Sequence, residues 1–341
     1  MSDTAAAPVA APLAPWLARQ LTSLLAQRGH AWLLQGPSGL GQYELALAMA
    51  SSWLCDKPTA QGACGQCGSC HAIAVRTHAD LCVLMPETTM VELAWPLSEK
   101  AQSDIDDKKR KASREIRVDA MRDAVEFAQR TSARGRGKVV LVYPAEDMNA
   151  ITANALLKTL EEPAGDVRFV LASASVHQLL PTIRSRCIGH PLAWPRADEA
   201  EHWLQSQGLN AVLAAKLLVA TGGRPAQALL WAQTGWDAAA WAAFPKAMQR
   251  GEVAAVKDWA PALLLDALHK LCHDLMALTQ GAAPRFFAPP DLAIGRPPLG
   301  GLGTWNQALS KALRTVDHPF NAGLMSESLV AQAQSVLNSK L

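Results

Sequence analysis

Residues 31–43 read AWLLQGPSGLGQY, and this stretch decides how the surrounding chain folds. Ala31 to Leu34 is a short apolar run, and the turn from Gly36 to Gly41 carries three glycines in six residues. The residues from Tyr43 to Trp53 favour a helix. A strand, a glycine-rich turn and a helix in this order are typical of the opening of a nucleotide-binding α/β domain.

Gly36 and Gly41 have the spacing of a phosphate-binding loop, G-x-x-x-x-G-K-[ST], in which lysine contacts phosphate and the hydroxyl holds magnesium. Gln42 replaces the lysine, and a neutral amide cannot supply its charge. Tyr43 replaces the hydroxyl residue, and a phenol ring is too bulky for the metal position. We therefore expect a degenerate loop that does not bind nucleotide firmly; an active site that tolerates Gln42 is the alternative.

Three further apolar runs predict strands, at Leu81 to Met85, Lys138 to Tyr143 and Arg168 to Ala172. Helical segments at Val118 to Gln129 and about 149–162 lie between them. This alternation predicts an α/β fold with a parallel sheet covered on both faces.

The end of the run KVVLV, residues 138–142, is where hydrolytic enzymes with this loop place their magnesium-holding acids. This chain has Tyr143 and Pro144 there. Glu146 and Asp147 follow and could supply a displaced acid. Two altered positions nevertheless predict that the chain does not hydrolyse ATP.

Four of the seven cysteines lie within sixteen residues, at Cys55, Cys64, Cys67 and Cys70. The glycines between them permit tight turns, so the spacing predicts a tetrahedral zinc site with four thiolates. With no open position, such a site would be structural. Unliganded thiols, or His71 in place of one cysteine, are the alternatives.

Composition predicts four regions along the chain. The Ala- and Pro-rich start, residues 1–15, predicts a flexible arm. The alternating strands and helices fill residues 16–195, with the zinc module at 55–70. Strand signals vanish from Arg196 onward, which predicts a small helical lid domain at 196–236 and a C-terminal helical bundle at 237–341.

A charged insertion occupies residues 88–117 of the second region. Its part from Glu99 to Arg117 carries seven basic and five acidic residues and hardly any large apolar ones. We expect this part to be solvated or disordered, and we assign it no role.

The formal net charge of +2 argues against a protein whose whole surface binds nucleic acid, although a local basic face remains compatible with it. No stretch approaches the roughly 20 apolar residues of a membrane span, and the N-terminus lacks the pattern of a signal peptide. We therefore expect a cytoplasmic protein without membrane contact.

The segment LLPTIRSRC, residues 179–187, places Arg184 and Arg186 on a short polar stretch. A guanidinium there can present a planar fork of donors to a partner's phosphate. An ordinary surface salt bridge is the alternative, and residue chemistry alone favours it.

The glycine loop, the four-cysteine insert, the string ANALLKTLEEP (153–163) and LLPTIRSRC together resemble the clamp-loader branch of the AAA+ family over about residues 16–235. The resemblance implies an AAA+ P-loop domain, a lid and a collar-type C-terminal bundle that serves oligomerisation. It also implies a non-hydrolysing member of the branch, because motor subunits keep the lysine and the acidic pair that this chain has lost.

The partners that the resemblance implies are the motor (gamma/tau) and delta subunits of a five-subunit ring, and, through that ring, a sliding clamp and primer–template DNA. Arg186, within Ser185 to Cys187, would act in trans as an arginine finger on ATP held by a neighbouring motor subunit. Two other hypotheses compete with a non-hydrolysing subunit: an active motor subunit, and a DNA-binding zinc module fused to a helical domain. The small net charge disfavours the second of these.

Overall fold

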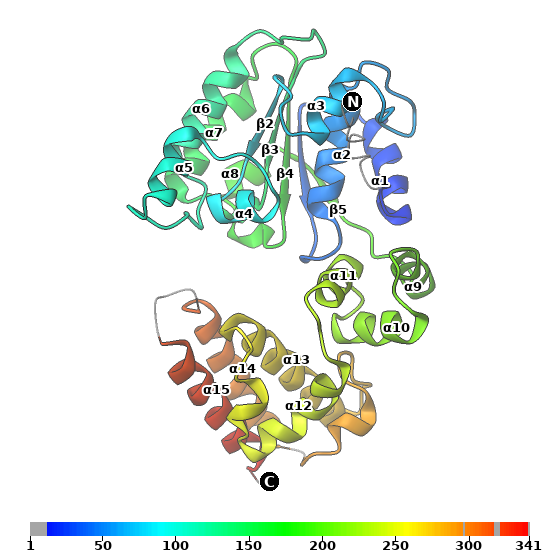
Figure 1. The fold of residues 1–341 in the computed structure, drawn as a ribbon, viewed down its shortest axis with the longest axis vertical. Helices are drawn as coiled ribbons and strands as arrows, with labels where there is room; N and C mark the ends of the chain where they lie inside the picture. The colour runs from blue at the N-terminus through cyan, green and yellow to red at the C-terminus, as the bar shows by residue number, and fades with distance from the viewer. Residues whose placement is uncertain (1–11, 296, 317–320, 340–341) are drawn as a thin grey trace, which may run out of the picture. The chain divides into compact units, whose positions relative to one another are not determined.

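A computed structural model describes residues 12–295, 297–316 and 321–339 (Figure 1). The chain divides into two compact units, residues 1–196 and 197–341. Residues 1–11, most of the predicted arm, lie outside the described residues, and helix α1 begins at Pro15. The further boundary at residue 236, between lid and C-terminal bundle, stays a prediction.

The first unit is built on a five-stranded sheet with strand order β2-β3-β4-β1-β5. All four strand pairs are parallel, so the α/β class with a parallel sheet is confirmed. The strands are β1 (Ala31–Gln35), β2 (Leu81–Leu84), β3 (Lys138–Val142), β4 (Val167–Ser173) and β5 (Ile188–Pro191).

Helices cover both faces of this sheet, because alternate residues of each buried strand point to opposite sides. Leu33, Val140 and Phe169 join the core that α6 and α7 cover, whereas Val139 packs with residues of α2 and α3. Figure 1 shows these two groups of helices on the two sides of the sheet. The helices of this unit are α1 (Pro15–Leu25), α2 (Gln42–Leu54), α3 (Gly68–Ala74), α4 (Glu87–Glu92), α5 (Glu99–Asp106), α6 (Val118–Gln129), α7 (Ala150–Glu161) and α8 (Pro181–Arg184).

Most residues of the segment 99–117 are exposed, as expected for a solvated segment, but the insertion also contains helices α4 and α5. Two anchors hold it to the rest of the unit. Ile116 is fully buried, and its N–H donates to the carbonyl oxygen of Asp147 at 3.0 Å. Glu87, only 7% exposed, accepts two hydrogen bonds from Arg110, at 2.5 and 2.8 Å, and one from the Ser113 N–H at 2.8 Å. A buried carboxylate paired in this way holds a polar segment that has few apolar contacts of its own.

The described elements of the second unit are helices, and its core is rich in aromatic rings. Trp241 lies at the centre, with its ring 4.7 Å from Phe287 and 5.3 Å from Trp231. No described helix, in either unit, is long and apolar enough to cross a membrane. The helices are α9 (Ala197–Ser206), α10 (Ala211–Ala220), α11 (Pro225–Gln233), α12 (Ala238–Arg250), α13 (Pro261–Thr279), α14 (Leu299–Leu313) and α15 (Ala322–Leu337).

Candidate functional site

The glycine-rich loop joins β1 to α2 and depends on glycine at two positions. Gly39 and Gly41 have φ angles of 85° and 99°, in the left-handed region that side chains disfavour. A Cβ atom on Gly41 would also lie 2.4 Å from Leu17 Cδ1. Glycine at position 41 is therefore required both by the backbone angle and by the packing of α1.

Gln42 turns its side chain back into this loop. Its residue is 3% exposed, and Nε2 donates to the carbonyl oxygens of Gly36, at 2.5 Å, and Pro37, at 2.8 Å. Both amide hydrogens are thus used within the loop itself. The side chain at the lysine position therefore offers no cation and no free donor to a phosphate.

Tyr43 is buried at the position where a nucleotide-binding loop carries its metal-holding hydroxyl. Its oxygen accepts a hydrogen bond from Trp95 Nε1 at 2.7 Å and one from Arg76 Nη1 at 3.2 Å. Its ring lies 5.4 Å from that of Tyr143. The guanidinium of Arg76 in turn lies 4.5 Å from the Trp95 ring centroid. An aromatic cluster therefore fills the space beside the loop.

The sequence did not single out Trp95 or Arg76. Trp95 lies inside the charged insertion, so the segment to which we assigned no role contributes a buried side chain at the loop. A large aromatic residue in a polar stretch was the available signal, because tryptophan is seldom left in water without a packing partner.

The acid Glu146, which follows β3, is engaged with the neighbouring strand end. Tyr143 and Pro144 stand at the end of the strand. Glu146 accepts a hydrogen bond from the Ala174 N–H at 2.9 Å, beyond the end of β4, and its other carboxylate oxygen is buried. Burial, followed by the negative charge of Glu44, raises the pKa of Tyr143 to about 12. The tyrosine is therefore a neutral phenol near neutral pH.

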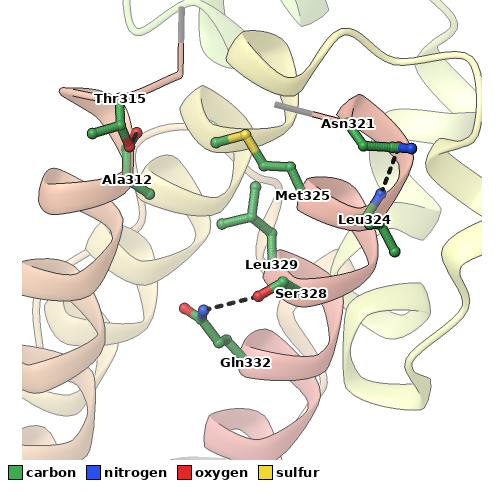
Figure 2. A pocket seen from close by; sticks show the side chains of 8 residues that line it. All are labelled: Ala312, Thr315, Asn321, Leu324, Met325, Ser328, Leu329 and Gln332. Atoms are coloured by element: carbon green, nitrogen blue, oxygen red, sulfur yellow. Dashed lines mark hydrogen bonds between the residues drawn. The ribbon is translucent and has the colours of Figure 1, made fainter. Parts of the chain in front are cut away.

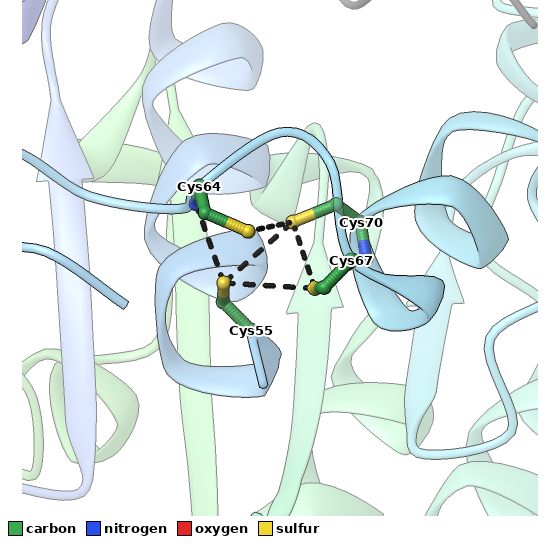
Figure 3. A group of neighbouring side chains, drawn as sticks. All are labelled: Cys55, Cys64, Cys67 and Cys70. Carbon is green, nitrogen blue, oxygen red and sulfur yellow. Dashed lines mark hydrogen bonds between the residues drawn. The ribbon is translucent and has the colours of Figure 1, made fainter. Parts of the chain in front are cut away.

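The four predicted metal ligands come together where α2 ends and α3 begins (Figure 3). All four sulfur atoms lie within 4.8 Å of one another. Four of the Sγ–Sγ distances are 3.8 Å for Cys55–Cys67, 3.9 Å for Cys64–Cys70, 3.4 Å for Cys67–Cys70 and 3.7 Å for Cys55–Cys70. A tetrahedral ion with bonds of about 2.3 Å to sulfur separates its ligands by about 3.8 Å, so the cluster fits zinc.

Backbone amides point at two of these sulfurs. The N–H groups of Lys57 and Cys64 donate to Cys55 Sγ at 3.4 and 3.3 Å, and the Cys70 N–H donates to Cys67 Sγ at 3.4 Å. The backbone amides of Gln66 and Cys67 and the neighbouring thiol of Cys55 lower the pKa of Cys64 to about 6. Such donors favour thiolate, which is the form that binds a metal ion. Burial acts in the opposite direction and raises the pKa of Cys55 and of Cys70.

Arg186 follows α8, and in this chain its guanidinium is held by its own unit. Nη2 forms an ion pair with the carboxylate of Glu161, the last residue of α7, and Nη1 donates to the Thr182 carbonyl oxygen at 2.9 Å. The two charged side chains are 32% and 45% exposed. Nε is buried without a hydrogen-bond partner among the described residues. The free chain thus has the surface ion pair that residue chemistry favoured.

A separate pocket of about 370 Å³ lies in the second unit beside α14 and α15 (Figure 2). Leu329 and Met325 form its floor, and Asn321 caps α15 at its rim by accepting from the Leu324 N–H at 3.2 Å. None of the lining side chains titrates near neutral pH, so the pocket offers no acid or base for catalysis.

A parallel sheet with a glycine loop between β1 and α2, and an arginine motif between β4 and β5, defines a P-loop protein of the AAA+ type. Residues 16–193 match the family described as DNA polymerase III, delta subunit. The chain belongs to the DNA polymerase III delta-prime family.

Several relatives carry the name DNA polymerase III subunit delta', and two of them show how far the match extends. The protein from Pseudomonas aeruginosa is 41% identical over 202 residues, which cover 59% of this chain and 55% of that protein. The protein from Escherichia coli is 32% identical over 279 residues, which cover 75% of this chain and 76% of that protein. The match thus spans about half of the first relative and three quarters of the second.

A crystal structure of a DNA polymerase III gamma subunit-related protein from Thermotoga maritima has a similar fold. Its TM-score is 0.50 at 16% identity, and the match covers 94% of this chain and all of that one. This similarity supports the AAA+ fold class.

Proposed function

We propose that this chain is a non-hydrolysing subunit of a DNA polymerase III clamp loader, which helps to place the sliding clamp on primed DNA. One observation carries the non-hydrolysing part of the proposal. Gln42 uses both amide hydrogens within its own loop, and Tyr43 and Tyr143 occupy the positions of the magnesium ligands. Without lysine or a metal ligand, the loop cannot stabilise the charge that develops during phosphoryl transfer.

The partners in this proposal are the gamma/tau motor subunits and the delta subunit, with the clamp and primer–template DNA reached through the complex. The family membership supports this assignment of partners. Similarity to tau and gamma subunits gives it further support. The tau subunit of Escherichia coli is 30% identical over 176 residues, which are 52% of this chain and 23% of that protein. A hetero-oligomer in the cytoplasm follows from such partners.

The four-cysteine cluster would hold one structural zinc ion. Cys55, Cys64, Cys67 and Cys70 supply a complete set of four ligands, so the ion would fix the loop between α2 and α3. An ion with all positions filled has no site for water or substrate. Its contribution would be to folding rather than to chemistry.

Arg186 would act on ATP in the neighbouring motor subunit. To do so it must exchange the carboxylate of Glu161 for a phosphate oxygen. An exposed ion pair of this kind contributes about 0–1 kcal/mol, so releasing it costs little. An arginine finger is worth about 10³–10⁵ in rate in well-studied P-loop enzymes. The small cost of releasing Glu161 is compatible with a guanidinium that moves to phosphate and stabilises the transition state of the neighbour's reaction.

Two measurements together test the proposed function. The isolated chain should have no ATP turnover above background, and it should co-purify with the motor and delta subunits when these are co-expressed. Turnover that persists through purification and disappears on mutation of the loop would favour an active motor subunit. If every protein in the experiment is folded and this chain still does not join the complex, the proposed clamp-loader role is wrong.

A further inference from the structure

The four-cysteine module is connected to the central sheet by a chain of polar contacts that starts beside two of its ligands. Ser69 lies between Cys67 and Cys70 on α3 and is fully buried. Its hydroxyl donates to Asp56 Oδ1 at 2.7 Å and accepts from Arg134 Nη1 at 3.1 Å. Two residues of the module are therefore bound to an arginine that comes from a distant part of the sequence.

Arg134 lies on the loop between α6 and β3, and its backbone is fixed from the other side. The N–H groups of Ala133 and Arg134 donate to the carboxylate of Asp80 at 2.7 and 2.9 Å, and the Ser132 hydroxyl donates to it at 3.0 Å. Asp80 directly precedes β2 and is fully buried. The carboxylate also lies 3.5 Å from the buried ammonium of Lys138 at the start of β3. A buried carboxylate with three hydrogen-bond donors and a buried cation is a firmly held anchor.

The side chain of Arg134 reaches from this anchor to the module. Its Nη1 lies 3.9 Å from Asp56 Oδ2, and a Cβ on Gly68 would lie 3.4 Å from the same nitrogen. Asp56 directly follows the ligand Cys55, and Gly68 directly follows the ligand Cys67. The guanidinium thus contacts both segments that carry the metal ligands.

We propose that Arg134 is a positioning residue of the metal site, which braces the two ligand-bearing segments against the Asp80 anchor through Ser69 and Asp56. This inference rests on the proposed metal site. Groups just outside the ligand set orient the ligands, and their loss typically lowers metal affinity about 10- to 100-fold. The coupling is reciprocal, so the bound ion also stabilises the loop from Ser132 to Arg134.

Zinc release from the purified full chain tests this role. With a colorimetric zinc chelator in excess, Arg134→Ala should release zinc about 10-fold faster than the unsubstituted chain. The matched control is Arg136→Ala, on the same exposed loop two residues further on, which should release zinc at the normal rate. Circular dichroism should be unchanged in both variants, because Arg134 is 42% exposed and is not part of the core.

Three further readouts separate positioning from a general loss of stability. Ser69→Ala should accelerate release about as much as Arg134→Ala, and the double variant should add little, because both substitutions break one chain of contacts. Arg134→Lys should recover part of the retention, since an ammonium can still donate to Ser69. Hydrogen exchange at the Ala133 and Arg134 amides should speed up when zinc is removed from the unsubstituted chain.

The result that would overturn the proposal is zinc release from Arg134→Ala within twofold of the unsubstituted rate, or amide exchange that does not depend on zinc. Additive effects of Arg134→Ala and Ser69→Ala would also contradict it. These failures differ from a failure of the metal site, which would appear as purified, unsubstituted protein that contains no zinc.

Discussion

The rings of Tyr43 and Tyr143 lie with centroids 5.4 Å apart and planes inclined by 34°. In a nucleotide-hydrolysing P-loop protein, the first position carries the hydroxyl and the second the carboxylate that hold magnesium. Here the same two positions contact each other through aromatic faces. The two departures from the motif are therefore structurally linked, because the two side chains pack against each other.

The hydrogen bond between Trp95 and Tyr43 predicts a stability cost for a small substitution. Tyr43→Phe keeps the ring but leaves Trp95 Nε1 without its acceptor at 2.7 Å. An unsatisfied buried donor costs about 1–3 kcal/mol, so the free energy of unfolding should fall by that amount. Urea denaturation followed by tryptophan fluorescence measures it. Tyr143→Phe, which removes the other hydroxyl of the pair, should cost less; equal losses would show that the Trp95 contact is unimportant.

Restoring the loop sequence alone should not restore catalysis. The double variant Gln42→Lys with Tyr43→Thr returns the lysine and the hydroxyl to the loop. Tyr143 and Pro144 would still stand where the acids belong, so magnesium would lack its second protein ligand. We expect no ATP turnover in a coupled assay on folded protein. Turnover clearly above that of the unsubstituted chain would mean that Glu146 or Asp147 can supply the acid.

The buried phenol of Tyr143 predicts a loss of stability at high pH. Its pKa is raised to about 12 in the folded chain, against about 10 in an unfolded one. Between these values the unfolded state loses the proton first, so stability is fully present below pH 10 and falls as the pH rises through 12, by up to about 1.4 kcal/mol per pH unit. Unfolding free energies at pH 9 to 11.5 should fall more steeply for the unsubstituted chain than for Tyr143→Phe. Parallel curves would show that the phenol ionises normally.

Four of the five strands and the four-cysteine cluster were predictable because their signals are local, whereas β5, Ile188–Pro191, has no apolar run and was not predicted. The run from Lys138 to Tyr143 is mostly apolar and rich in β-branched valine, which favours a strand in a buried sheet. Cys64, Cys67 and Cys70 lie close enough in sequence for turn geometry to bring their sulfurs together. In both cases the residues that form the feature lie within a short stretch of the sequence.

The contacts that the sequence did not indicate join residues far apart along it. Trp95 reaches Tyr43 across 52 positions, and Arg134 reaches Ser69 across 65. The charge pattern of residues 99–117 suggested solvent, whereas burial of Ile116 and pairing of Glu87 order the segment. Such pairings depend on the completed fold, because they join residues that are far apart along the chain, and no local pattern indicates them.

The cysteine cluster predicts about one zinc ion per chain. Protein purified under reducing conditions without chelator should contain it by elemental analysis, because four thiolates fill all positions of a structural site. Cys64→Ser should lower the zinc content strongly, since one ligand is lost. Cys82→Ala removes a thiol that lies outside the cluster and should leave zinc at one per chain. Metal-free but folded unsubstituted protein would rule the site out.

The ion pair between Arg186 and Glu161 allows the arginine finger to be tested in trans. Arg186→Ala removes a side chain that is one-third exposed, so folding and assembly of the complex should be nearly unchanged. ATP hydrolysis at the motor site beside this subunit should fall about 10³-fold or more, because the developing phosphoryl charge loses its cation. Total DNA-stimulated hydrolysis should then drop by the share of that one site, and clamp loading should slow.

Arg184→Ala is the matched control, because Arg184 is exposed, carries the same charge and lies two residues away. It should leave hydrolysis unchanged if position, rather than net charge, makes Arg186 effective. Glu161→Gln frees the guanidinium of Arg186 and should keep or raise the hydrolysis rate, since only a competitor of the phosphate is removed. If the complex with Arg186→Ala loads clamps at the normal rate, Arg186 is not an arginine finger, and its role is the intramolecular ion pair with Glu161. A complex that fails to assemble would instead make Arg186 an interface residue, and equal losses in Arg184→Ala and Arg186→Ala would point to the charge of the segment as a whole.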